Sequence, residues 1–148
     1  MTDPSDSATA RISTLAAELR ATIGKLSRRL RDQTHFNDLT WTQISVLYRL
    51  EQEGPATVTH LARAAGMRPQ SMGANIAALE AAGFVTGRPD PGDGRQPLLS
   101  ITPACEEWIR AGRAARQDWL HNAIQNQLDP AEQAQLSSAI ALLKRLGD

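Results

Sequence analysis

The sequence predicts a mainly α-helical protein with one small β-hairpin. Aromatic residues make up only 4% of the chain, whereas alanine, leucine, glutamine and arginine, which favour helices, are abundant. Apolar residues recur every three or four positions over most of the chain, the spacing of one helix face. β-prone runs occur between residues 84 and 101, on either side of a loop rich in turn residues.

Length and composition restrict the class of protein. The 148 residues suffice for one ordinary domain with a core, and 41% hydrophobic with 22% charged residues indicates a soluble globular chain. No apolar run approaches the roughly 18 residues of a membrane span, and the polar N-terminus is unlike a signal peptide. We therefore expect a cytoplasmic protein that makes no contact with a membrane.

The first 36 residues predict one long helix. Residues 1–8 carry Pro, Ser and Asp without periodicity and predict a disordered tail. From residue 9 an apolar stripe follows at steps of three and four, and it fades near residues 34–37. The stripe consists of Ile12, Leu15, Leu19, Ile23, Leu26 and Leu30. So much apolar surface on a small domain suggests a partner.

A second helix is predicted from Thr40 to about Glu53. Thr40 can cap its first turn, Gln43 can reach back to the cap, and Leu39 can pack on Ile44. The pair Gly54-Pro55 ends it.

Two further helices and a turn follow. Thr59 is predicted to cap a short helix that Gly66 closes, and Pro69 opens a longer helix that ends at Gly83. The small Ala62, the turn at Gly66 and the apolar Met72 together predict a helix-turn-helix. The outward face of its second helix carries Arg68, Gln70, Ser71, Ala74 and Asn75, of which the polar members can contact DNA bases and phosphates.

The β-prone runs predict a wing beside the helix-turn-helix. Residues 84–88 and 98–101 form the expected strands, joined by the loop at 90–95. Pro97 cannot donate to a ladder, so its strand is an edge or is broken near its start. A long helix is then expected from residue 103 to about 127, and Asp129-Pro130 starts the final helix.

This order of elements resembles the MarR family of winged helix-turn-helix transcription regulators over roughly residues 10–146. The most specific match is D-P-G-D-G-R-Q-P-L-L-S-I-T-P at residues 90–103, followed by L-A-x-x-x-G at 61–66 and L-E-x-x-G-F-V at 79–85. The resemblance implies a winged helix-turn-helix region at residues 37–102. It also implies a helical dimerisation region at 9–36 and 103–148, in one integrated subunit.

The resemblance implies a sequence-specific regulator that binds double-stranded DNA at an inverted repeat as a homodimer, acting as a repressor. Arg95 would enter the minor groove with Asp93 holding its guanidinium. The helix from residue 68 to 75 would enter the major groove. Gly73 and Ala74 stand where the family often has serine and arginine, so base readout would lean on Gln70, Ser71 and Asn75. The candidate DNA-binding residues are Arg68, Gln70, Ser71, Asn75, Arg88, Asp93 and Arg95.

The family also implies a dimer interface and an effector. The expected interface residues are Ile12, Leu15, Leu19, Trp119, Ile140, Leu143 and Leu146. A small aromatic effector would bind in a cleft between the dimerisation and winged-helix regions, relieving repression. The candidate pocket residues are Phe36, Trp41, Ile44, Tyr48, Met67 and Trp108, and for each of them ordinary core packing is the competing interpretation.

Other functions remain open at this point. The chain has 16 basic and 16 acidic side chains, so net charge gives no nucleic-acid signal. A winged-helix protein-interaction module that has lost DNA binding is therefore the alternative, favoured also by Gly73 and Ala74. No catalytic or phosphate-binding motif is found, and the histidines lack companion ligands, so no enzyme, cofactor or metal is expected. The single cysteine, Cys105, is expected to be a buried packing residue, although a reactive thiol stays open.

Overall fold

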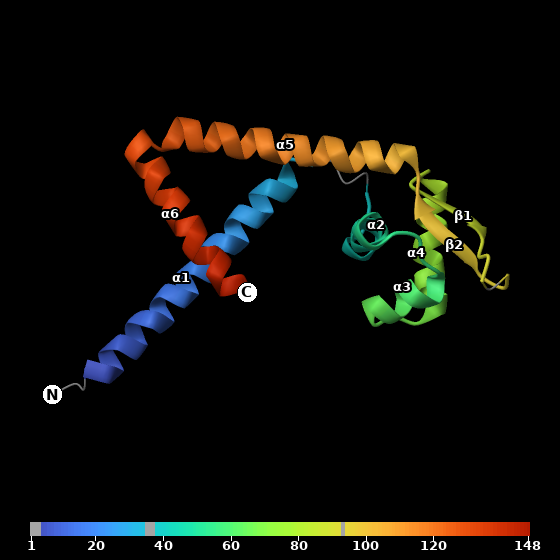
Figure 1. The fold of residues 1–148 in the computed structure, drawn as a ribbon, viewed down its shortest axis with the longest axis horizontal. Helices are drawn as coiled ribbons and strands as arrows, with labels where there is room; N and C mark the ends of the chain where they lie inside the picture. The colour runs from blue at the N-terminus through green and yellow to red at the C-terminus, as the bar shows by residue number, and fades with distance from the viewer. Residues whose placement is uncertain (1–3, 35–37, 93) are drawn as a thin grey trace. The chain divides into compact units, whose positions relative to one another are not determined.

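The computed structural model describes residues 4–34, 38–92 and 94–148. The described residues form six helices and one two-stranded sheet (Figure 1): α1 (Pro4–Asp32), α2 (Trp41–Glu53), α3 (Val58–Ala65), α4 (Pro69–Ala81), β1 (Val85–Pro89), β2 (Pro97–Ile101), α5 (Pro103–Gln127) and α6 (Pro130–Gly147). The fold is therefore mainly helical with a β-hairpin, as predicted. It divides into a helical unit, residues 1–34 and 114–148, and a winged-helix unit, residues 35–113.

The helical unit contains α1, the second part of α5, and α6. α1 begins at Pro4, so residues 4–8, predicted to be a disordered tail, belong to the helix. Proline is favoured in a first helical turn because its missing N–H has no partner there, and the carboxylate of Asp6 suits the positive end of the helix dipole.

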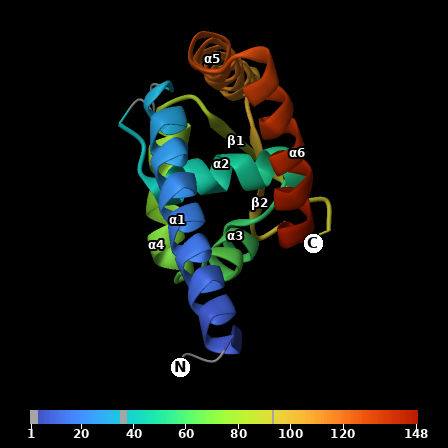
Figure 2. The ribbon, with the colours of Figure 1, turned by 90° about the vertical axis from the view of Figure 1, so that its left-hand side faces the viewer.

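α6 folds back from the end of α5 (Figures 1 and 2). Its start is fixed by a reciprocal cap: Asp129 Oδ1 accepts from the Glu132 backbone N–H at 2.8 Å, and Glu132 Oε1 accepts from the Asp129 N–H at 3.0 Å. The predicted restart at Asp129-Pro130 is confirmed. No residue of α1 or α6, both described over their whole length, is buried.

The winged-helix unit holds the hydrophobic core. α2 begins with the predicted capping box, in which the Gln43 N–H donates to Thr40 Oγ1 at 3.2 Å and the Thr40 N–H donates to Gln43 Oε1 at 3.0 Å. Side chains from every element of the unit meet in one cluster: Val46, Leu47, Leu50, Leu61, Ala62, Met72, Ile76, Leu79, Phe84, Val85, Leu99, Cys105 and Ile109.

The cap of α3 differs from the prediction. Thr57, not Thr59, is the N-cap: its backbone is extended, and its Oγ1 accepts from the His60 N–H at 3.2 Å. Thr59 lies inside the first turn, where its hydroxyl is available for another contact. The chain then turns at Gly66, whose φ of 65° is left-handed and favours glycine. Both threonines offer the same capping chemistry, so the residue type alone does not distinguish them.

α4 and the hairpin follow the sequence closely. Pro69 is the first residue of α4. Gly83, just after the end of the helix, has a left-handed φ of 80°. The strands pair antiparallel from Val85↔Ile101 to Pro89↔Pro97. An isolated bridge also joins Ala56 to Leu99, so the connection between α2 and α3 lies against the hairpin.

Candidate functional site

α4 presents a short polar face at its N-terminal end. Its inner face is closed by Met72, Ile76 and Leu79, all buried in the core. The side chains of Arg68, Gln70, Ser71 and Ala74 are exposed. The first turn of α4 therefore offers one cation, one amide and one hydroxyl to a ligand.

Asn75 does not point fully outward from α4, as a residue that reads DNA bases would be expected to. It is half-buried, and its Oδ1 accepts from Gln43 Nε2 at 3.4 Å while its Nδ2 donates to the Ser71 carbonyl at 3.3 Å. Gln43 is also part of the α2 capping box. The Asn75 amide thus joins α4 to the start of α2, a link that the residue pattern of either helix alone does not reveal.

The hairpin carries the second group of candidate side chains. Arg88 on β1 and Arg95 on the returning limb are both exposed. They border a hollow of about 610 Å³ whose other lining residues include Glu80, Gly87 and Pro97. Asp93, the predicted partner of Arg95, lies outside the described residues. Because cations line the hairpin on both limbs, it can receive an anionic ligand.

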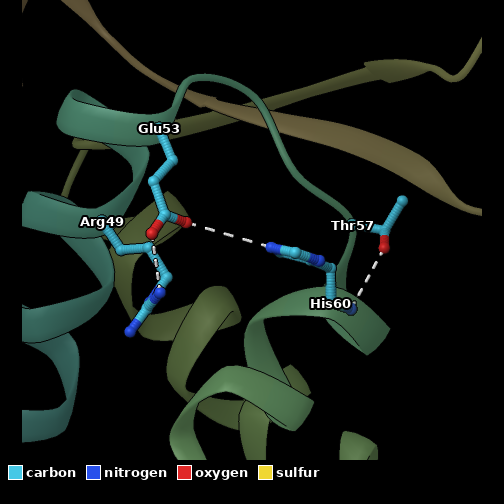
Figure 3. A network of polar contacts seen from close by, with 4 residues as sticks. All are labelled: Arg49, Glu53, Thr57 and His60. Carbon is cyan, nitrogen blue, oxygen red and sulfur yellow. Dashed lines mark hydrogen bonds and ion pairs between the residues drawn. The ribbon is translucent and has the colours of Figure 1, made fainter.

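A network of polar contacts joins α2 to α3 (Figure 3). Glu53 accepts from Arg49 Nη1 at 2.9 Å, and His60 Nε2 lies 4.0 Å from the other Glu53 oxygen. All three side chains are exposed, so solvent weakens the attraction between Arg49 and Glu53. The pattern of neither helix alone predicts this network, because its members come from two helices separated by a turn.

The predicted ligand-pocket residues are only partly brought together. Trp41 and Met67 line a hollow of about 430 Å³ between α2 and α3. Ile44 is buried, and Tyr48 and Trp108 pack against the core, where the Trp108 ring lies 5.3 Å from the ring of Phe84. Phe36 lies outside the described residues. The remaining lining of the hollow is Thr42, Ser45, Val46, Arg49, Leu61, Ala64 and Ala65.

Comparison with known proteins identifies this arrangement. A model of the MarR family matches residues 37–96, which include the helix-turn-helix and most of the hairpin. A helix-turn-helix transcriptional regulator of Mycobacterium bovis is 38% identical over 134 residues, covering 90% of this chain and 93% of the relative. Another, of Mycobacterium leprae, is 40% identical over 106 residues, covering 72% and 74%. The chain belongs to the MarR family.

Solved structures share the fold of this MarR-family chain. A transcriptional regulator of Pseudomonas aeruginosa has a TM-score of 0.79 at 31% identity, covering 93% of this chain and 96% of that one. A variant of S. aureus MepR bound to an oligodeoxyribonucleotide has a TM-score of 0.71 at 16% identity, covering 90% and 98%. The family and its relatives indicate a DNA-binding transcriptional regulator with a winged helix.

The helical unit of this MarR-family regulator exposes large apolar side chains. Ile12 is 64% exposed, Leu15 63% and Leu146 74%. Ile140 and Leu143 are also exposed, whereas Leu19 and Trp119 are half-buried. All seven predicted interface residues thus retain accessible surface. In the part of the chain that the structure describes, no helix is long and apolar enough to cross a membrane.

Cys105 is buried in the core of the regulator, as predicted. Burial, with the nearby carboxylates of Glu51 and Glu106, raises the pKa of its thiol to about 11. Glu51 also accepts two hydrogen bonds from Arg113, each of 2.7 Å, which tie α5 to α2. At neutral pH the thiol is therefore protonated, the form that is a poor nucleophile and a poor metal ligand.

Proposed function

We propose that the chain is a homodimeric repressor that binds an inverted repeat in double-stranded DNA and is released by a small aromatic ligand. The observation that carries the DNA-binding role is the exposure of Arg68, Gln70 and Ser71 on α4 next to a hairpin that exposes Arg88 and Arg95. In this proposal α4 occupies the major groove and the hairpin reaches the minor groove. We call α4 the recognition helix and the hairpin the wing.

Each candidate residue has a role suited to its chemistry. Arg68 and Arg88 contact phosphates, while Gln70 and Ser71 contact base edges. Arg95 lies in the minor groove, where narrow A·T-rich stretches concentrate negative potential. For Asp93 we retain the role expected from the sequence, which is to hold the guanidinium of Arg95. The formal neutrality of the chain does not oppose this, since DNA contact depends on local positive charge.

Homodimerisation explains the apolar surface of the helical unit. α1 and α6 contain no buried residue, yet they carry isoleucines and leucines that are 39–74% exposed. A second copy of the chain would remove that surface from water, which is the principal driving force for association. A dimer also matches the two halves of an inverted repeat.

The ligand role rests on the hollow between α2 and α3. Its floor contains the buried Val46 and Leu61, its wall includes Trp41, and Arg49 supplies a cation. An aromatic ring can stack on the indole, and an anionic substituent can approach the guanidinium. Because Met67 lies two residues before the first residue of the recognition helix, occupation of this hollow can alter the position of that helix.

The decisive experiment is a gel shift on the intergenic DNA upstream of the gene, at several salt concentrations. Specific binding with a steep salt dependence is expected, and Arg95→Ala should weaken it more than tenfold, roughly the value of a well-placed charged contact. Arg20→Ala, which removes an arginine from α1, is the control and should leave affinity unchanged. Absence of specific binding would favour the protein-interaction module, whose main support is the small side chains at Gly73 and Ala74.

The ligand role is tested separately with salicylate. Titration should change tryptophan fluorescence and release the DNA, and Trp41→Ala should remove both responses without altering DNA affinity in the absence of salicylate. Release that survives Trp41→Ala would place the effector elsewhere.

A further inference from the structure

One hydrogen bond connects the wing to the first helix of the helix-turn-helix. Thr59 Oγ1 donates to Gln96 Oε1 at 2.9 Å, across 37 positions of sequence, in a partly buried setting. Gln96 directly follows Arg95 and directly precedes the first residue of β2. The bond therefore ends one residue away from the side chain proposed to enter the minor groove.

The backbone ladder of the wing stops before Gln96. Its outermost register pair is Pro89↔Pro97, and proline has no N–H to donate to the opposite strand. The ladder thus provides no donated backbone bond at the end nearest the tip. The Gln96 side chain lies one residue beyond that point, where a side-chain contact can replace the missing backbone restraint.

A second anchor lies deeper in the hairpin. Ala56 and Leu99 exchange two backbone hydrogen bonds, of 3.0 and 2.8 Å, which fix the base of β2 to the connection between α2 and α3. Leu99 and Gln96 are three residues apart, a span of about 10 Å in an extended strand. Two anchors at that separation fix the direction of β2, whereas the Leu99 anchor alone leaves the tip free to pivot.

Thr59 is a firm attachment point for the wing. It lies within the first turn of α3, which Thr57 caps. α3 is held against the recognition helix through Ala62 and Met72, both fully buried in the same core. The Thr59–Gln96 bond therefore relates the wing tip to the recognition helix through rigid structure.

We propose that Thr59 and Gln96 are positioning residues for Arg95: their hydrogen bond sets where the wing tip lies relative to the recognition helix. The inference rests on the proposed wing contact with DNA. Without the bond, residues 94–96 sample more conformations before binding, and the entropy lost on ordering them reduces affinity. Neither residue need touch DNA for this effect.

The test is a double-mutant cycle on the intergenic DNA fragment described above. Thr59→Val removes the hydroxyl and nearly keeps the shape of the side chain. It should weaken DNA binding about three- to tenfold, the change in affinity that corresponds to the free energy of one neutral hydrogen bond. Gln96→Leu should have the same effect. In an Arg95→Ala background both substitutions should have almost no further effect, because the side chain that they position is gone.

Two controls separate positioning from damage to the fold. Thr59→Ser keeps the hydroxyl and should restore binding. Thr9→Val makes the same substitution in α1, where the hydroxyl donates to the Ser5 carbonyl, and should leave affinity unchanged. Thermal unfolding of each variant shows whether the fold is retained.

A readout of sequence preference completes the experiment. Replacing A·T pairs by G·C pairs under the wing should weaken the wild-type complex, and this preference should disappear in Thr59→Val as it does in Arg95→Ala. Losses of equal size with and without Arg95, or no loss from Thr59→Val and Gln96→Leu, overturn the positioning role. No loss from Arg95→Ala alone instead overturns the wing contact, so the two failures are distinguishable.

Discussion

Replacing Gly73 in the recognition helix by alanine is expected to stabilise the protein. Gly73 lies in the middle of α4 and is not among the described glycines with positive φ, so its backbone suits any L-residue. A Cβ built on it meets no atom within 4 Å. Glycine in a helix interior costs about 0.5–1 kcal/mol relative to alanine because it loses more backbone freedom on folding. With no steric cost to oppose it, that whole amount should be gained.

The gain is large enough to measure. For a chain of about 150 residues, a change of 1 kcal/mol shifts Tm by about 2–4 °C, so Gly73→Ala should raise Tm by about 1–4 °C. Circular dichroism at 222 nm, at one fixed protein concentration, provides the measurement. The concentration must be fixed because the stability of a dimer depends on it.

Gly66 supplies a matched control. A Cβ at Gly66 also meets no atom within 4 Å, but its φ of 65° is left-handed. Gly66→Ala should therefore lower stability by about 1–2 kcal/mol, the cost of that conformation for an L-residue. The two substitutions make the same chemical change and differ in backbone conformation. A lower Tm for Gly73→Ala, or equal shifts for the two variants, would refute the reasoning.

Three further predictions concern other parts of the chain. The native Cys105 thiol should resist Ellman's reagent at pH 8. Since its folded pKa of about 11 exceeds the ordinary value of 9.0, stability should fall as pH rises from 9 to 11, and Cys105→Ala should lack that decline in unfolding titrations. Leu143→Glu or Leu146→Glu should convert the proposed dimer to a monomer in size-exclusion chromatography, and a dimer that persists would place the interface elsewhere. Gln43→Ala and Asn75→Ala should weaken all operator variants uniformly in gel shifts, whereas a loss confined to one base pair would mean that Asn75 reads that base.

Much of the fold followed from local signals. The capping box at Thr40 and Gln43, the proline start of α4 and the helix start at Asp129-Pro130 were predicted correctly, because a helix end is decided by a few adjacent residues whose side chains satisfy nearby backbone N–H groups. The helix-turn-helix was also predictable, since Ala62, Gly66 and Met72 each meet a steric requirement that only a few residue types satisfy. Motif order then predicted the family that the comparisons show.

The local sequence did not predict a helix cap correctly where two nearby residues offered the same capping chemistry. Thr57 and Thr59 can both cap a helix, and the sequence prediction chose the wrong one. The Thr59 hydroxyl instead donates to Gln96, whose side chain lies beside it only after the hairpin folds against α3. The hydrogen bond between Asn75 and Gln43 likewise joins two helices, so the pattern of α4 alone does not predict it.

The sequence by itself therefore determined the order of the helices and most of their ends, the turn at Gly66 and the cationic wing, since these follow from the propensities and patterns of neighbouring residues. Tertiary structure alone decided which polar side chains are exposed and which join one element to another. A hydrogen bond across 37 positions depends on the packing of a whole core, and no pattern within either segment specifies its partner.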